Sequence, residues 1–212
     1  MLRSINRLVT PTAGRIFIDG EDITDATSTA LKRLRGKVGM IFQNFNLVKR
    51  SLVIRNVLAG RLGYVPTWRT LLGFFPRMDK EIALECLNRV GIPEKAGVRA
   101  DALSGGQQQR VGIARALAQQ PKIILADEPV ASLDPPTSHA VMKDLRRINR
   151  EDKITTLVNL HFIDMALEYA DRIIGLRDGR LVFDGPAEQA TEKVFEEIYG
   201  RALTDDDVIG EA

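Results

Sequence analysis

Two adjacent carboxylates, Asp127 and Glu128, follow the apolar run 122–126, which predicts a buried β-strand. Ligands of parallel α/β sheets bind beyond the carboxyl ends of the strands. One acid at that edge is suited to hold a hydrated Mg²⁺, a cation that prefers oxygen ligands and bridges phosphates. The other is suited to polarise a water molecule for attack. Taken alone, the pair is equally compatible with an exposed acidic loop.

A second candidate lies just upstream, where the pentapeptide LSGGQ (103–107) opens a predicted helix over 105–119. A serine and two glycines at a helix start expose backbone N–H groups and the positive end of the helix dipole, which bind phosphates. Most glycine-rich turns are only turns. The order of pentapeptide, Gln/Arg-rich helix and apolar strand ending in Asp-Glu is far more specific than either motif alone.

The elements that must position these residues alternate between strands and helices. Apolar runs predict strands over 15–20, 37–43, 122–126, 154–160, 172–176 and 181–183. Helical periodicity predicts helices over 1–9, 27–35, 52–61, 79–90, 105–119, 136–150 and 163–169. This alternation predicts an α/β fold with a largely parallel sheet, interrupted by a mainly helical segment.

Composition narrows the classes of function. The 212 residues are 44% hydrophobic and 27% charged, as in a globular domain with a sizeable core. Since the net charge is only +2, no strong field for nucleic acid or anionic lipid is expected. The single cysteine, Cys86, excludes an internal disulfide and a multi-cysteine metal site, and its apolar surroundings predict a core position. The sequence contains no apolar run of membrane-spanning length.

Three further segments allow predictions. The aromatic stretch from Tyr64 to Phe75, which contains Trp68, is compatible with a small core under a helical insertion and with an exposed docking surface for a partner. His139 lacks chemical neighbours in the sequence and is expected on the surface. The acidic tail 204–207 is expected to fray.

Taken in order, the motifs resemble those of the nucleotide-binding subunits of ATP-binding cassette (ABC) transporters. The matching segments are Gln43 (Q-loop), 103–107 (signature motif), 123–128 (Walker B strand), 132–134 (D-loop) and His161 (switch histidine). The resemblance implies a P-loop NTPase core of the RecA-like type over 1–50 and 121–212. It also implies a helical signature subdomain over 51–120, the two forming one domain.

The same resemblance implies ATP and Mg²⁺ as ligands and a role for each motif. Asp127 would hold Mg²⁺ partly through water, and Gln43 would contact the metal or the attacking water. Glu128 would act as general base, and His161 would sense the γ-phosphate. In a two-fold homodimer, residues of one subunit would bind the ATP held by the other and align the two sites. These residues are Ser104, Gly105, Gly106, Gln107 and Asp134.

Within the family, the segments 42–48, 56–63, 68–75 and 160–161 resemble the ATP-binding subunits of phosphonate importers. Such a subunit implies transmembrane permease subunits, a solute-binding protein and a peripheral place on the cytoplasmic face of the inner membrane, without nucleic acid. Three alternatives stay open: an importer of polar amino acids, methionine or another small anion; a non-transport ABC ATPase; and a non-catalytic partner subunit.

The family's phosphate loop, GxxGxGKS or GxxGxGKT, is not found in this sequence, and Met1 falls just after the expected end of that loop. We therefore expect an N-terminally truncated cassette, arising from a fragment or a misplaced gene start. A genuinely shortened subunit unable to hold ATP in its own site and a degenerate product are the other two interpretations. We expect weak ATP binding, open sheet edges and low stability for the chain as written.

Overall fold

The computed structural model describes residues 2–210. Its helices are α1 (Leu2–Ile5), α2 (Ser28–Lys37), α3 (Val53–Leu58), α4 (Thr67–Leu71), α5 (Arg77–Arg89), α6 (Gly105–Ala118), α7 (Pro135–Asp152), α8 (Ile163–Tyr169) and α9 (Glu192–Tyr199). Its strands are β1 (Phe17–Ile18), β2 (Glu21–Asp22), β3 (Val38–Ile41), β4 (Ile123–Asp127), β5 (Thr155–Asn159), β6 (Arg172–Arg177) and β7 (Arg180–Pro186). No helix within 2–210 is long and apolar enough to cross a bilayer.

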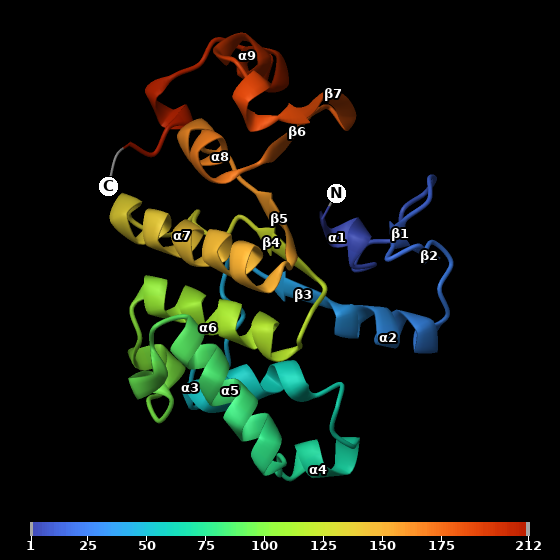
Figure 1. The fold of residues 1–212 in the computed structure, drawn as a ribbon, viewed down its shortest axis with the longest axis vertical. Helices are drawn as coiled ribbons and strands as arrows, with labels where there is room; N and C mark the ends of the chain where they lie inside the picture. Colours follow the sequence, from blue (N-terminus) through green and yellow to red (C-terminus); the bar gives the residue numbers. More distant parts are fainter. Residues whose placement is uncertain (1, 211–212) are drawn as a thin grey trace.

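The elements form three regions along the long axis of the molecule (Figure 1). Helices α3 to α6 make up one end, and β6, β7, α8 and α9 make up the other. Between them lies a parallel sheet in the order β3-β4-β5, flanked by α6 and α7. This arrangement confirms the predicted α/β fold with a parallel sheet and a helical segment.

Strand β4 is the central strand of this sheet. Ile124, Leu125 and Ala126 are fully buried, as the continuous apolar run predicts. In the parallel register, Ile41 of β3 lies opposite Ala126, and Asp127 lies opposite Asn159 of β5. The carboxyl ends of the three strands therefore share one edge of the sheet, and the polar residues that follow them lie close together.

Strand β5 is less buried than its apolar sequence predicts. Within the described residues it pairs only with β4, while β6 pairs only with β7 in a separate antiparallel hairpin. A cavity of about 1000 Å³ is lined by residues of both β5 and β6. The expected open sheet edge is therefore present, and it faces this cavity.

The main hydrophobic core joins the helical end to the sheet. Fully buried side chains of α3, α5 and α6, among them Val57, Leu87 and Ile113, pack in one cluster with Ile124 and with Val141 of α7. Cys86 belongs to this cluster, as predicted, and burial raises the pKa of its thiol to about 11.

The aromatic stretch from Tyr64 to Phe75 is partly core and partly exposed surface. Val65 is buried and Phe75 packs against the main core. Trp68 and Leu71 of α4 and the following Phe74 are exposed, Leu71 by 82%. The stretch is therefore anchored at its ends and presents apolar side chains to solvent in between.

The N-terminal helix is shorter than predicted. Helix α1 ends at Ile5 instead of residue 9, because Arg7 takes a left-handed conformation with φ 52°. The Leu8 N–H donates to the Arg3 carbonyl and the Arg7 N–H to the Ser4 carbonyl, the hydrogen-bond pair of a Schellman helix end. Apolar spacing alone cannot reveal such an end.

Two predictions are wrong, the surface position of His139 and the frayed acidic tail 204–207. His139 is buried on α7, its Nδ1 2.9 Å from the Tyr169 hydroxyl and its Nε2 3.1 Å from the Gly210 carbonyl. The acidic tail is ordered as a short 3₁₀ turn, Asp205–Asp207, because Asp207 accepts hydrogen bonds from Arg201 and Thr204. These contacts hold the pKa of Asp207 at about 2.

Candidate functional site

Asp127 stands at the carboxyl end of β4, held there by the buried apolar residues before it. Its carboxylate accepts a hydrogen bond from Asn159 Nδ2 at 3.4 Å and forms an ion pair with Arg3 Nε at 3.1 Å. The contact with Asn159 follows directly from the parallel register of β4 and β5. Asp127 is therefore a partly buried acid with oxygens directed at the sheet edge, as a magnesium ligand requires.

Glu128 follows immediately and turns away from the strand, with a left-handed φ of 51°. His161 Nε2 lies 2.8 Å from a Glu128 carboxylate oxygen, and donates to it in the matching tautomer. The imidazole is exposed and the carboxylate half-buried. A carboxylate oriented in this way and still in reach of solvent is placed to accept a proton from a water molecule.

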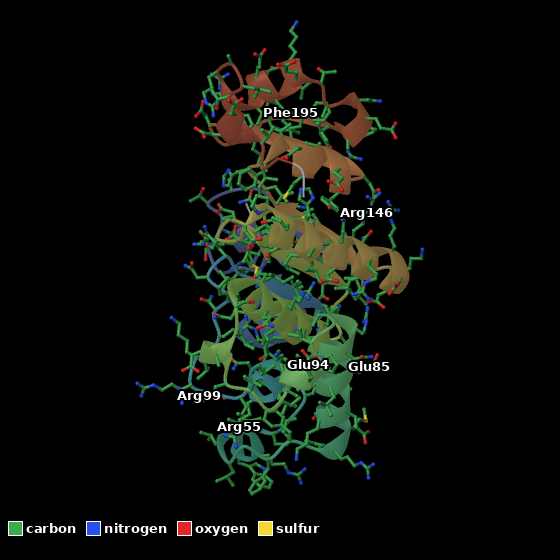
Figure 2. The ribbon with its side chains drawn as sticks, turned by 90° about the vertical axis from the view of Figure 1, so that its left-hand side faces the viewer. Arg55, Glu85, Glu94, Arg99, Arg146 and Phe195 are labelled. Carbon is green, nitrogen blue, oxygen red and sulfur yellow. The ribbon has the colours of Figure 1, made fainter. Side chains whose placement is uncertain are left out.

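Gln43 comes two residues after the end of β3 and lies at the same edge of the sheet as Asp127 and Glu128. It lines the cavity of about 1000 Å³ together with Asp127, Glu128, Asn159 and His161. The structure therefore gathers four of the predicted site residues, which derive from three parallel strands and the segments that follow them. Arg146 of α7 and Phe195 of α9 line other parts of the cavity and are labelled in Figure 2.

Two residues of this site were not predicted from the sequence. Asn159 is a polar residue at the carboxyl end of an apolar strand, a signal that could have found it. Tyr199 of α9 donates its hydroxyl proton to the His161 carbonyl at 2.5 Å and so braces the backbone of the histidine. It follows His161 by 38 residues, and no local pattern indicates this contact.

The signature residues form a self-capped helix start. Ser104 Oγ accepts from the Gln107 N–H at 3.3 Å, and Gln107 Oε1 accepts from the Ser104 N–H at 3.1 Å, which makes a capping box for α6. A Cβ on Gly106 would lie 2.3 Å from Thr137 Cγ2, so any larger residue there would displace the Thr137 side chain. The turn therefore packs tightly against the start of α7.

Asp134 caps α7 in a similar way. Its carboxylate accepts from the Thr137 N–H at 3.3 Å, and the hydrogen bonds from Thr137 hold its pKa below the ordinary value. Leu133 lies beside Gly105, 3.2 Å from the position of a Cβ there. Within the described chain, neither Asp134 nor the segment 104–107 lines the cavity that holds the other predicted residues. The predicted site residues thus fall into two separate groups.

Known proteins with similar sequences are numerous. A family model described as "ABC transporter" matches residues 1–131. The chain is 66% identical over 210 residues to "Phosphonates import ATP-binding protein PhnC 3" of Halalkalibacterium halodurans, covering 99% of the chain and 81% of that protein. It is 64% identical over 211 residues to "Phosphonates import ATP-binding protein PhnC 1" of Oceanobacillus iheyensis, covering 100% and 82%.

Solved structures resemble the fold as well. A dimeric ATP-binding cassette in a post-hydrolysis state, bound to ADP and Pi, matches with a TM-score of 0.74 and 36% identity, covering 88% of this chain and 78% of that one. The cbiO1 subunit of a Clostridium perfringens ABC transporter complex matches with a TM-score of 0.78 and 28% identity, covering 94% and 77%. On the evidence of its motifs, its fold and these relatives, the chain belongs to the ABC transporter family of ATP-binding cassettes.

Proposed function

We propose that the chain is the ATP-binding and ATP-hydrolysing subunit that energises an ABC importer of phosphonates. The observation that carries the ATPase assignment is the Glu128–His161 pair beside Asp127, in a cavity also lined by Gln43. The choice of phosphonates as the solute rests on the names of relatives that are 60–66% identical. An ATPase subunit does not bind the solute, so its own residues do not identify it.

Asp127 and Gln43 are the residues that would hold a hydrated Mg²⁺. Within 2–210, no three His, Cys, Asp or Glu side chains converge on one point. A single carboxylate with amide oxygens nevertheless fits magnesium, which keeps several waters and binds substrate phosphates. When bound, the ion neutralises charge on the phosphates. Arg3 occupies the same carboxylate and must withdraw when the cation binds.

The reaction assigned to this site is attack of water on the γ-phosphate of ATP. Glu128 accepts a hydrogen bond from the water, orients it and takes its proton. His161 holds the Glu128 carboxylate in place, and its exposed imidazole would be free to contact the γ-phosphate, which leaves ADP as its bond to the β-phosphate breaks. The Tyr199 hydroxyl holds the backbone carbonyl of His161.

A second copy of the chain completes the site. Ser104, Gly105, Gly106 and Gln107 would bind the ATP of the partner, and Asp134 would align the two sites. Their position outside the cavity of their own chain supports this division of roles. The start of α6 offers backbone N–H groups and a positive dipole end to a phosphate.

The other partners are transmembrane permease subunits and a solute-binding protein, which place the chain on the cytoplasmic face of the inner membrane. We assign nucleotide chemistry to the core over 1–50 and 121–212, and contact with the permease to the helical subdomain over 51–120. The exposed Trp68, Leu71 and Phe74 support this contact, because exposed apolar groups of this kind mark interaction sites.

The decisive experiment compares Glu128→Gln with Glu188→Gln in the assembled importer, after the family's phosphate loop has been restored to the chain. Loss of the general base should lower the rate of hydrolysis by about 10³-fold, while ATP binding persists. Glu188 is an exposed carboxylate outside the cavity, and its substitution should leave the rate unchanged. Unchanged turnover in Glu128→Gln would show that the base is another residue.

The solute requires a separate measurement. ATP hydrolysis by the importer in vesicles should rise when its solute-binding protein is loaded with an alkylphosphonate, and should stay at the basal rate with polar amino acids. Stimulation by amino acids and not by phosphonate would reject the phosphonate assignment and keep the ATPase assignment.

A further inference from the structure

The loop after Gln43 has an unusual backbone. Phe45 and Asn46 are consecutive left-handed residues, with φ 58° and 48°. Residues other than glycine rarely adopt this conformation, and two in succession persist only where the surroundings hold them. The loop has few hydrogen bonds of its own: the Phe45 N–H donates to the Phe42 carbonyl at 3.2 Å, and the Asn46 N–H to the Asn44 carbonyl.

Arg115 of α6 supplies the missing contacts. Its Nη2 donates to the Phe45 carbonyl at 2.8 Å and its Nη1 to the Asn46 carbonyl at 2.5 Å. The left-handed turn directs both carbonyls at the same guanidinium, which binds them as a planar fork. Arg115 is half-buried, and this burial lowers the pKa of its guanidinium.

The face of α6 next to Arg115 lies against this loop. A Cβ on Gly112 would lie 3.9 Å from the Phe45 carbonyl and 3.9 Å from Gln109 Oε1, and one on Gly105 would lie 3.9 Å from the Phe45 ring. Gln109 is 0% exposed, and neither of its amide atoms has a hydrogen-bond partner within the described chain. The loop therefore rests on α6 from its first turn to Arg115.

We propose that Arg115 is a positioning residue, which clamps the loop 44–47 to α6 and thereby sets where Gln43 stands in the cavity. Helix α6 begins at the signature turn, so one rigid element carries both this turn and the clamp. A displacement of the turn is then transmitted to Gln43 through a single helix and two hydrogen bonds. The part of this inference that concerns Gln43 rests on the proposed function.

The clamp itself is tested without nucleotide, by hydrogen–deuterium exchange of the 212-residue chain. In Arg115→Gln, the amides of Phe45 and Asn46 should exchange at least about tenfold faster, since their local opening is no longer opposed by the guanidinium. The Val48 amide, which donates to Asn56 at 2.8 Å, should change less. Exchange in β4 should stay unchanged. The matched control is Arg110→Gln on the same helix, whose guanidinium pairs with Asp144 at 3.1 Å. Unchanged loop exchange in a folded Arg115→Gln, or equal acceleration in both variants, overturns the clamp.

If Arg115→Gln does not fold, two substitutions of Asn46 in the loop test the same contact. Asn46→Gly adopts the left-handed conformation freely, and the loop amides should keep their slow exchange. Asn46→Val opposes that conformation through its branched Cβ, so the carbonyls should leave Arg115 and exchange should accelerate by about tenfold. Equal exchange in the glycine and valine variants contradicts the proposal.

Kinetics of the assembled importer test the link to Gln43. Arg115→Lys keeps the charge but loses the fork, so kcat should fall about tenfold with KM for ATP changed less than about twofold, as for a contact made in the transition state. Arg110→Lys should change neither. Accelerated loop exchange with an unchanged kcat would refute the positioning of Gln43. Failure of the proposed function is recognised separately, as unchanged turnover in Glu128→Gln.

Discussion

The two sides of the parallel sheet are built differently. On the helical side, α3, α5 and α6 fill the space against β4 with fully buried side chains. On the other side, β5 faces a cavity of about 1000 Å³, and Ile174, Leu176 and Leu181 of the β6–β7 hairpin are exposed. The catalytic candidates line the open side, while the signature turn and the Arg115 clamp belong to the closed one.

The largest loss of stability is expected on the closed side, from Arg61→Ala. Arg61 is buried, pairs with Asp79 at 2.8 Å and donates to the Ala118 carbonyl at 2.9 Å. Removal of the guanidinium strands a buried carboxylate, at a cost of about 3–5 kcal/mol in the free energy of unfolding. Urea unfolding measures this loss. Arg77→Gln is the control, since the Arg77–Glu81 pair is exposed and contributes less than about 0.5 kcal/mol.

Leu87→Ala should cost nearly as much. Leu87 is 0% exposed in the centre of the main core, so its truncation leaves a cavity and loses about 3 kcal/mol of the free energy of unfolding. Thermal unfolding followed by circular dichroism measures the change. A loss below 1 kcal/mol would mean that the helical side relaxes to fill the space, and the contrast between the two sides would then be weaker than the static structure indicates.

The ordered acidic tail, which lies outside both sides, should respond to acid at an unusually low pH. Its pKa of about 2, against an ordinary 3.8, means that Asp207 binds its proton more readily in the unfolded chain. The stabilisation is therefore complete above pH 3.8 and is lost as the pH falls toward about 2. Titration of the Asp207 carboxyl carbon by NMR tests this. In Arg201→Gln the midpoint should move back toward the ordinary value, because the main hydrogen-bond donor is gone.

The smallest effect is expected at Ile174, which lines the cavity and is 42% exposed. Ile174→Thr keeps the branched shape suited to a strand and should change the free energy of unfolding by less than about 0.5 kcal/mol. Urea unfolding beside Leu87→Ala gives the comparison directly. A loss as large as that of Leu87→Ala would mean that the cavity side is closed in solution.

Local sequence signals predicted those elements whose stability depends on neighbours in the chain. The apolar run ending in Asp127-Glu128 became β4 with its acids at the sheet edge, and α8 has the predicted bounds 163–169. The meeting of Gln43, Glu128 and His161 was expected only from the family resemblance. It depends on parallel pairing between strands that are distant in sequence.

Distant contacts explain the errors. His139 is buried because Tyr169 and Gly210, which lie 30 and 71 residues further along, supply partners for its ring. Strand β5 has the sequence of a buried strand but is half-exposed, because its free edge faces the cavity and no further strand. The left-handed residues Arg7 and Phe45 are of types that give no indication of such a backbone.

The left-handed backbone of Glu128 has a consequence for how this sequence can change. A glycine at that position would relieve about 1 kcal/mol of strain, and the polypeptide would fold more readily. It would also have no carboxylate to offer to a water molecule. Selection for stability alone would therefore disfavour the carboxylate that we propose as the general base. Directed evolution for heat resistance, without an activity screen, should find substitutions at Glu128 early.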